Sequence, residues 1–229
     1  MQRPARIAID GPAGSGKSTI GELLAKRLGY LYIDTGAMYR AVAWLALQER
    51  ANLYDAQALV RLAQSADIVI SHPHIDDGRQ YTVTVGGRDV TWEIRSVPVT
   101  SAVPLVAAHS EVRAILIAQQ RVMARQKGGV VMVGRDIGAV VLPDAELKIY
   151  LTASLLERAR RRYTELEQQR SAASSSLPSL EEVVQDIARR DEIDHNNSRP
   201  AADAIVITTD NLTIEQVLEV IASYLEEPV

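Results

Sequence analysis

Cysteine is absent from this sequence of 229 residues, and so are long apolar runs. Without a thiol the chain has no disulfide framework, no thiolate metal site and no cysteine nucleophile, which is compatible with a reducing compartment. No apolar run reaches the roughly 18 residues of a transmembrane helix, and the apolar segment near the start is interrupted by Asp10, too early for a signal peptide. We therefore expect a soluble, cytoplasmic protein.

A strong excess of either charge is also lacking. Lysine and arginine together number 25 against 29 aspartates and glutamates, for a formal net charge of −4. This balance argues against a general nucleic-acid or membrane-surface binder, so any cluster of arginines must serve a local purpose. The length suits one α/β domain with a small insertion. We expect no nucleic-acid or membrane partner, and a monomer.

A glycine-rich stretch, GPAGSGKS at residues 11–18, fits the pattern GxxxxGK[ST]. Residues 5–9 before it have the pattern of a short buried strand, and residues 17–28 after it that of a helix. Glycines let such a loop turn its N–H groups inward beside the positive end of the helix dipole, which makes a nest for polyphosphate. We expect Lys17 along the β- and γ-phosphates and Ser18 on a bridging Mg²⁺.

The residues predicted to bind ATP are Gly11, Pro12, Ala13, Gly14, Ser15, Gly16, Lys17, Ser18 and Thr19. The alternative, a turn that merely links strand to helix, is disfavoured because strand, loop and helix occur together.

Five apolar runs have the character of parallel strands that are buried on both faces, and helical patterns alternate with them. They span residues 5–9, 30–33, 130–133, 147–151 and 204–207. This alternation predicts an α/β doubly wound sheet, whose ligands lie at the carboxyl ends of the strands. Asp10, Asp34 and the turn at residues 134–136 follow three of these strands, so we expect them to converge. Asp10 or Asp34 is a candidate to contact Mg²⁺ through water.

Two regions depart from the alternation. Between residues 67 and 91 the patterns DIVISH, QYTVTV and RDVT, with a turn at Gly86 and Gly87, predict three short antiparallel strands. Residues 171–179, SAASSSLPS, have low complexity and suggest a mobile connection between helices. Capping boxes are expected at three helix starts. These pair Ser154 with Glu157, Ser179 with Glu182, and Thr213 with Gln216.

Arginines suggest how an acceptor is held. Arg158, Arg161 and Arg162 share one face of the helix after the fourth strand, where they are either a solvated basic face or a lid that closes on transferring phosphoryl oxygens. Single arginines also follow apolar runs, at Arg40, Arg135 and Arg190. Their planar forks suit a phosphate monoester, although surface ion pairing is the alternative for each.

Other P-loop classes can be tested on the sequence. No NKxD-type guanine reader is present, which argues against a GTPase. The third strand ends in VGRD rather than in adjacent acids, which argues against an AAA-type motor. A small kinase remains, with a non-enzymatic nucleotide-gated switch as the alternative.

Several motifs occur in an order that resembles the bacterial cytidylate kinases over nearly the whole chain. They are IAIDGPAGSGKST, YIDTGAMYRAVA, EIRS, VGRDIGAVVLPDAELKIYLTAS, ERARRR and RRDEID. DTGAMYR together with GRDIG is the specific part. The resemblance implies a nucleoside monophosphate kinase fold of P-loop type, in which residues 67–105 form a monophosphate-binding insert and residues 154–193 a lid region. It also implies transfer of the γ-phosphate of ATP to CMP or dCMP; UMP or another small acceptor is the alternative.

The resemblance also assigns residue roles. The implied CMP-binding residues are Thr35, Arg40, Arg113, Arg135, Asp136, Arg190 and Asp194. Among them Arg40 and Arg135 would bind the phosphate, and Arg190 and Asp194 the ribose. An arginine beside a carboxylate, Arg113 and Asp136, would match the N3 acceptor and amine donor of cytosine, whereas uracil would face the carboxylate with an oxygen.

Catalysis is expected to need no general base, because the acceptor phosphate is largely ionised near neutral pH and is itself the nucleophile. Positioning and charge neutralisation would then do the work. The expected catalytic residues are Lys17, Arg40, Arg135, Arg158 and Arg162, with Mg²⁺ at Ser18.

Three positions depart from the family pattern. Pro104 stands where a base-binding serine is usual, and Ser101 is a candidate substitute. Asn197 stands where an arginine is usual, and Arg199 is the candidate replacement. Val133 replaces the acid that often precedes GRD.

Overall fold

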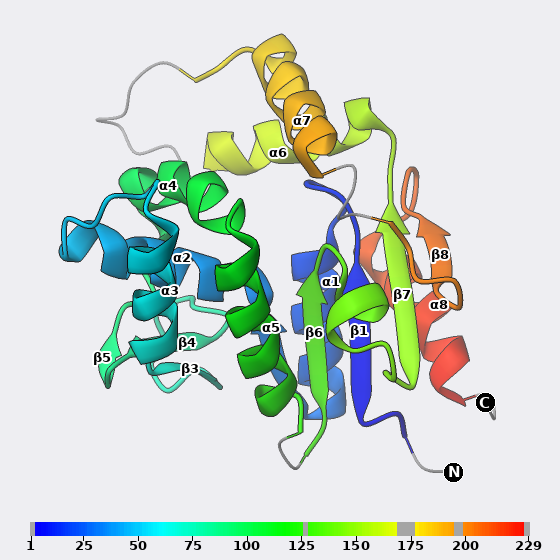
Figure 1. Ribbon diagram of the computed structural model, residues 1–229. Helices are drawn as coiled ribbons and strands as arrows, with labels where there is room; N and C mark the ends of the chain where they lie inside the picture. Colours follow the sequence, from blue (N-terminus) through cyan, green and yellow to red (C-terminus); the bar gives the residue numbers. More distant parts are fainter. Residues whose placement is uncertain (1–2, 126–127, 169–176, 195–198, 227–229) are drawn as a thin grey trace. The chain divides into compact units, whose positions relative to one another are not determined.

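The computed structural model describes residues 3–125, 128–168, 177–194 and 199–226. Figure 1 shows its strands and helices. The strands are β1 (Arg6–Asp10), β2 (Leu31–Asp34), β3 (Ile68–Ser71), β4 (Thr82–Val85), β5 (Arg88–Asp89), β6 (Val130–Gly134), β7 (Leu147–Thr152) and β8 (Ile205–Thr208). The α-helices are α1 (Lys17–Leu28), α2 (Thr35–Gln48), α3 (Ala56–Ser65), α4 (Val97–Ala107), α5 (Ser110–Met123), α6 (Leu155–Gln168), α7 (Leu180–Asp194) and α8 (Ile214–Glu226). Two shorter helical elements are the 3-10 helix η1 (Glu93–Arg95) and the π-helix η2 (Ile137–Val141).

The larger sheet has five strands in the order β2-β6-β1-β7-β8. β7 pairs in parallel with β1 and with β8, and Figure 1 shows it between them. Apolar side chains of β1 are fully buried, as expected for a strand covered on both faces. The predicted α/β class and five-stranded parallel sheet are therefore confirmed. The bounds differ by a residue or so because Asp10 and Asp34 still belong to the strands that they end.

A second sheet of three antiparallel strands, β3-β4-β5, lies where the sequence predicts an insertion. Gly86 and Gly87 form its tight turn with φ values of 56° and 77°, which glycine adopts without strain. The predicted antiparallel insert is thus confirmed in its strands. Its bounds at residues 67–105 remain a prediction.

The chain divides into two compact units, which are described separately below. Unit 1 comprises Met1–Leu24 and Val133–Val229, and unit 2 comprises Ala25–Met132. In unit 2 the core includes much of α2, and Met38 and Ala41 are fully buried there. In unit 1 the core includes Ile7 and Ile9 of β1 and Leu151 of β7, so the strand ends that carry polar residues rest on rigid elements.

Helices α6 and α7 of unit 1 form a pair with its own apolar cluster. Ala159 of α6 packs with Val183 and Ile187 of α7, and partly buried apolar side chains surround them. Figure 1 shows the pair following the carboxyl end of β7. This agrees with a helical lid, whose bounds at 154–193 stay a prediction. The low-complexity segment expected to be mobile lies largely outside the described residues, which stop at 168 and resume at 177.

The predicted capping boxes are present at two helix starts and incomplete at the third. At α7 the Ser179 hydroxyl accepts from the Glu182 N–H, and the Glu182 carboxylate accepts from the Ser179 N–H. At α8 Thr213 and Gln216 exchange the same two hydrogen bonds. At α6 the Ser154 hydroxyl accepts from the Glu157 N–H, but the return bond is missing. There Asp210 takes the Ser154 N–H, and Glu157 pairs with an arginine instead.

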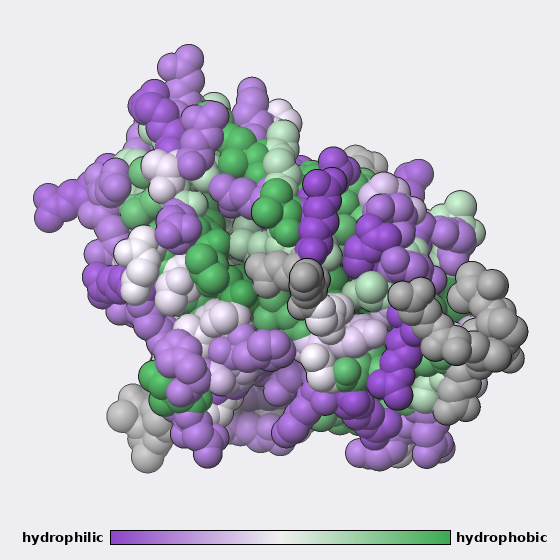
Figure 2. Space-filling model, turned by 90° about the horizontal axis from the view of Figure 1, so that it is seen from below, coloured by the Kyte–Doolittle hydropathy of each residue, from purple (hydrophilic) through white to green (hydrophobic). Residues whose placement is uncertain are grey.

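The surface is mixed in character. Figure 2 shows apolar residues interspersed with polar ones over the face that it presents. Some apolar side chains stand out singly, among them Tyr54 and Val97, and single exposures of this kind are normal. Within the described ranges no single helix is long and apolar enough to cross a membrane, although α4 and α5 meet these criteria when taken together across a bend of 103°.

Candidate active site

The phosphate-binding loop connects β1 to α1, as the sequence predicts. Gly14 and Gly16 take positive φ values of 75° and 87°, and the loop closes with a bond from the Ser15 N–H to the Pro12 carbonyl. Helix α1 begins at Lys17, so the positive end of its dipole lies at the end of the loop. Lys17 itself donates from Nζ to the Pro12 carbonyl at 3.0 Å. The strand, the loop and the helix start are therefore those of an anion nest.

Packing as well as phosphate binding demands glycine in this loop. A Cβ built on Gly11 would collide with the carbonyl oxygen of Leu151 in β7. A Cβ on Gly14 would come within 2.9 Å of both the Cβ and the carbonyl oxygen of Arg158 in α6. The loop thus lies directly against two other elements of unit 1.

Asp10, the last residue of β1, anchors the turn that follows β6. Its two carboxylate oxygens accept from the N–H groups of Ile137 and Gly138 at 2.7 and 2.8 Å, and its side chain is buried. Burial raises the pKa of Asp10 to about 6, with a smaller raising effect from Asp136, while the two N–H donors and Lys17 oppose it. Asp10 and the GRD turn are therefore close in unit 1, as predicted, and Lys17 is near enough to act on the charge of Asp10. The expected convergence with Asp34, which belongs to unit 2, stays a prediction. Water-mediated contact of Asp10 with Mg²⁺ stays a prediction.

Arg135 and Asp136 lie in that same turn, directly after β6. Asp136 is buried, and its carbonyl accepts from the N–H groups of Val140 at 2.8 Å and Val141 at 3.3 Å. The bond from Val141 has the π-helical spacing and begins the stretch η2. Single π-helical turns are frequent at functional sites. The structure therefore fixes the backbone that carries both predicted CMP-binding residues.

The arginines of α6 separate into two kinds. Arg158 is buried, and its guanidinium contacts the Ala13 carbonyl at 3.1 Å and Asp191 of α7 at 2.6 and 3.0 Å. Arg161 donates to the hydroxyl and carbonyl oxygens of Thr209, at 2.9 and 2.7 Å. Arg162 is 41 % exposed and its pair is with Glu165 on its own helix. The shared face expected from the sequence thus holds one solvent-facing arginine and two that are bound to neighbouring elements.

Helix α7 carries the predicted ribose-binding residues. Arg190 pairs with Asp186 one turn earlier on the same helix, at 2.7 Å, and is about half exposed. Asp194 ends the helix, but its side chain lies outside the described residues, as does the whole of Asn197. Arg199 is exposed, and its replacement of the usual arginine stays a prediction.

In unit 2 the residues after β2 form a cluster around Asp34. This aspartate caps α2 by accepting from the Gly36 N–H at 3.0 Å, and it pairs with Arg40 at 3.4 Å. Burial lowers the pKa of Arg40, but Asp34, Tyr81 and Tyr32 together outweigh this effect, so the net pKa of Arg40 is raised. Thr35, the first residue of α2, is buried. The cluster holds Arg40 as a cation with its side chain about one third exposed.

Tyr81 and Arg95 extend this cluster into the insert. The Tyr81 hydroxyl donates to Asp34 at 3.2 Å and accepts from the Arg95 guanidinium at 2.9 Å. Arg95 also lies over the Tyr81 ring, 5.3 Å from its centroid. Burial raises the pKa of Tyr81 well above its usual range, with Asp34 adding to the effect. The Tyr81 hydroxyl therefore stays protonated and able to donate to Asp34.

The base-reading region of unit 2 is helical. Arg113 lies in the first turn of α5, and Pro104 lies inside α4 without ending it, since the Pro104 carbonyl still accepts from the Ala108 N–H. Ser101 belongs to the same helix. The predicted CMP-binding residues thus divide between units: Thr35, Arg40 and Arg113 belong to unit 2, and Arg135, Asp136, Arg190 and Asp194 to unit 1. Their joint role stays a prediction.

Sequence reasoning missed three residues. Arg95 and Asp191 lie within the motifs EIRS and RRDEID but had no assigned role, and Tyr81 was taken only as a strand residue. Each of the three contacts a partner far away in the chain. For Arg95 and Asp191 the only signal in the sequence was membership of those two motifs, and for Tyr81 there was none.

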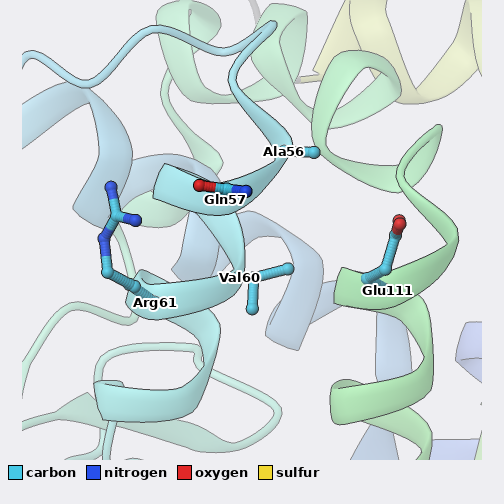
Figure 3. A pocket seen from close by; sticks show the side chains of 5 residues that line it. All are labelled: Ala56, Gln57, Val60, Arg61 and Glu111. Atoms are coloured by element: carbon cyan, nitrogen blue, oxygen red, sulfur yellow. The ribbon is translucent and has the colours of Figure 1, made fainter.

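A surface hollow of about 370 Å³ lies elsewhere in unit 2. Figure 3 shows its lining, with Glu111 on α5 facing residues of α3. The lining residues are Ala56, Gln57, Val60, Arg61 and Glu111. None of them is a predicted site residue, so the hollow is not assigned to catalysis.

Ser18 is the predicted ligand of Mg²⁺. Within the described ranges, no group of three or more His, Cys, Asp or Glu side chains is placed to hold a metal ion. Ser18 lies in the first turn of α1, directly after Lys17 and next to the loop. One hydroxyl beside a polyphosphate nest fits a Mg²⁺ whose other ligands are phosphate oxygens and water.

Comparisons with known proteins agree with this geometry. Residues 7–227 match the family model described as cytidylate kinase. A cytidylate kinase of Herpetosiphon aurantiacus is 52 % identical over 221 residues, 96 % of this chain and 94 % of that protein. A cytidylate kinase of a Geobacillus species is 48 % identical over 99 % of both chains.

A solved shikimate kinase of Bacteroides thetaiotaomicron has a similar fold, with a TM-score of 0.51, 14 % identity and coverage of 97 % of this chain and 99 % of that one. At this identity the likeness concerns the fold alone. The sequence relatives carry the finer assignment: the chain belongs to the cytidylate kinase family.

Proposed function

We propose that the protein is a phosphotransferase that moves the γ-phosphate of ATP to CMP or dCMP and releases ADP with CDP or dCDP. The observation that carries this proposal is the P-loop nest of unit 1, in a chain whose relatives are cytidylate kinases over nearly its whole length. Action as a cytoplasmic monomer, expected from the sequence, remains a prediction.

The reaction forms one bond and breaks one. An oxygen of the CMP phosphate attacks the γ-phosphorus, and the bond from that phosphorus to the β,γ-bridging oxygen breaks, so that ADP leaves with the bonding electrons. The acceptor is already an anion near neutral pH, so no side chain has to remove a proton. Mg²⁺, held with ATP at Ser18, would neutralise phosphate charge when bound. The residues of the chain then have to position the reactants and stabilise the developing charge.

On the donor side the proposed groups are the nest N–H donors and Lys17. Lys17 now rests on the Pro12 carbonyl at 3.0 Å, an exchangeable neutral acceptor, so it can turn to the β- and γ-phosphates. Arg162, the solvent-facing member of the set Arg158, Arg161 and Arg162, is proposed to stabilise the transferring group. The same proposal for Arg158 is taken up below, because its guanidinium already has several partners.

On the acceptor side Arg40 and Arg135 are proposed to bind the CMP phosphate. Arg40 is suited to this because its ion pair with Asp34 is long, at 3.4 Å, and its side chain is partly exposed. Thr35 would line the pocket, Arg113 and Asp136 would read the cytosine edge, and Arg190 with Asp194 would hold the ribose. Supporting this, Asp136 is buried, which strengthens a charge-assisted hydrogen bond to the exocyclic amine.

The test is a coupled assay of ADP release with ATP-Mg²⁺ and, in turn, CMP, dCMP, UMP, AMP, shikimate or no acceptor. We expect release that depends on CMP or dCMP and far less with the other acceptors. Turnover with UMP or another compound alone would transfer the proposal to that acceptor. ATP binding without any acceptor-dependent release would identify a nucleotide-gated switch instead.

A further inference from the structure

Among the described side chains of the lid helices α6 and α7, Arg158 is the most enclosed charged one, with 7 % of its side chain exposed. Its Nε donates to the Ala153 carbonyl at 3.1 Å, and one terminal nitrogen donates both to the Ala13 carbonyl and to Asp191. The other terminal nitrogen binds the second oxygen of Asp191 at 2.6 Å. Most of the donor capacity of the guanidinium is therefore committed within unit 1.

The contact with Ala13 controls a donor of the nest. The Ala13 carbonyl and the Gly14 N–H belong to one peptide unit, and in a trans peptide these two groups point in opposite directions. A guanidinium that holds the carbonyl therefore also sets the direction of the Gly14 N–H. Gly14 leaves no space for a Cβ against Arg158, so the two residues are in close contact along their backbones.

Asp191 in turn fixes the guanidinium. The fork of two hydrogen bonds, at 3.0 and 2.6 Å, sets the plane of the Arg158 side chain, and the carboxylate offsets its buried charge. Asp191 is the immediate neighbour of Arg190 on α7.

We infer that Arg158 and Asp191 are positioning residues that hold the P-loop peptide between Ala13 and Gly14 in its anion-binding orientation. They act through the backbone of the loop, and Arg158 does not contact the transferred group. The inference deepens the proposed function and rests on it for the identity of the donor, ATP. It differs from the lid role expected from the sequence, in which Arg158 closes on the transferring phosphoryl oxygens, because it places the effect on donor affinity rather than on the chemical step.

The experiment measures the dissociation constants of MgATP and of magnesium tripolyphosphate, a probe without base or ribose, by calorimetry. Arg158→Lys keeps the charge but loses the planar fork, and Asp191→Asn keeps the shape but loses the charge. We expect Arg158→Lys to raise both constants about tenfold and Asp191→Asn to raise both about threefold. The double variant should be no weaker than Arg158→Lys alone, because the two residues act as one unit.

Matched controls are Arg160→Lys and Glu192→Gln, two exposed residues of the same helices. Both should leave the two dissociation constants unchanged. At saturating ATP and CMP the Arg158 and Asp191 variants should lose less in kcat than in donor affinity, since donor binding is then complete. Melting temperatures identify any variant that fails to fold, and Asp191→Asn, the mildest change, then carries the test.

Three results would overturn the inference. Unchanged constants with a much lower kcat would make Arg158 a direct ligand of the transferring phosphoryl group. Weaker binding of MgATP but not of tripolyphosphate would place the effect on the nucleoside. Unchanged constants and kcat with a lower melting temperature would leave only a stabilising role. Absence of CMP-dependent ADP release by the wild type would refute the proposed function, whereas the tripolyphosphate measurement would still decide the role of Arg158.

Discussion

The P-loop region of unit 1 and the Arg40 cluster of unit 2 hold their cations in different ways. Arg158 beside the P-loop is buried and has short hydrogen bonds, down to 2.6 Å. Arg40 pairs with Asp34 at the longer distance of 3.4 Å, and about one third of its side chain is exposed. The first arrangement uses charged side chains to fix backbone groups, whereas the second leaves a guanidinium able to change partner. We infer that the donor site forms before its ligand arrives, and that Arg40 adjusts to its ligand.

This difference has an energetic meaning. A preformed nest loses little conformational freedom when phosphate binds, so its contacts contribute to affinity with little reorganisation. Under the proposed function Arg40 would exchange Asp34 for the CMP phosphate, and because both partners are charged acceptors we expect this exchange to cost little. Changes in unit 1 should therefore have the larger effects.

The largest effect is expected from Lys17→Ala. Under the proposed function the lysine ammonium stabilises the charge that moves during transfer, so its loss should lower CMP-dependent ADP release about 10³-fold or more. The fold should remain, because Lys17 is not part of the apolar core. Lys26→Ala, an exposed lysine in the last turn of the same helix, is the control. Turnover near wild type in Lys17→Ala would refute the P-loop assignment.

Asp136→Asn asks whether the buried carboxylate of unit 1 reads the base. Loss of a charge-assisted bond of ~1.5–3 kcal/mol should lower kcat/KM for CMP roughly 10- to 150-fold. UMP should lose less, because the new amide can donate to its exocyclic oxygen. The measurement is kcat/KM for both substrates in wild type and variant. A CMP:UMP ratio that does not change would mean that Asp136 only orients an arginine.

The Asp10 anchor predicts a pH dependence of stability. Its pKa of about 6 in the folded protein lies above the ordinary value of 3.8, so the native state binds more protons between these limits. The free energy of unfolding that Asp10 contributes should therefore fall as pH rises from about 4 to 6, and stay constant above. Relative to Asp10→Asn, the wild type should lose about 2 kcal/mol between pH 4.5 and 7.5. Urea denaturation of both proteins at both pH values checks this. A wild type that gains stability relative to Asp10→Asn as the pH rises would contradict it.

Tyr81→Phe should have the smallest effect and tests unit 2. It removes the hydroxyl that joins Asp34 to Arg95, so Arg40 loses support indirectly. We expect the KM for CMP to rise about threefold, with little change in kcat or in the affinity for MgATP. Tyr54→Phe, at an exposed position, is the control. A change in MgATP affinity instead would remove the distinction between the two regions.

Local patterns carried most of the prediction from sequence. The P-loop, the five strands and the capping boxes depend on residues a few positions apart, and the structure has all of them apart from the return bond at Ser154. The environment of each arginine could not be predicted in this way. Arg158 meets Asp191, 33 positions away, and Tyr81 meets Asp34, 47 positions away. Such partners are chosen by the packing of whole elements, which helical spacing alone does not reveal.

The crowding at Gly11 and Gly14 has a consequence for how this motif changes during evolution. Substituting either glycine would drive a side chain into the backbone of β7 or α6, whether or not a nucleotide ever binds. A library selected only for folded protein should thus still reject changes at both glycines while accepting many at Lys17. In a related protein that no longer needed the activity, we expect Lys17 to be substituted before Gly11 and Gly14. In such lineages it is the lysine, and not the glycine pattern, that records whether the loop still serves a triphosphate.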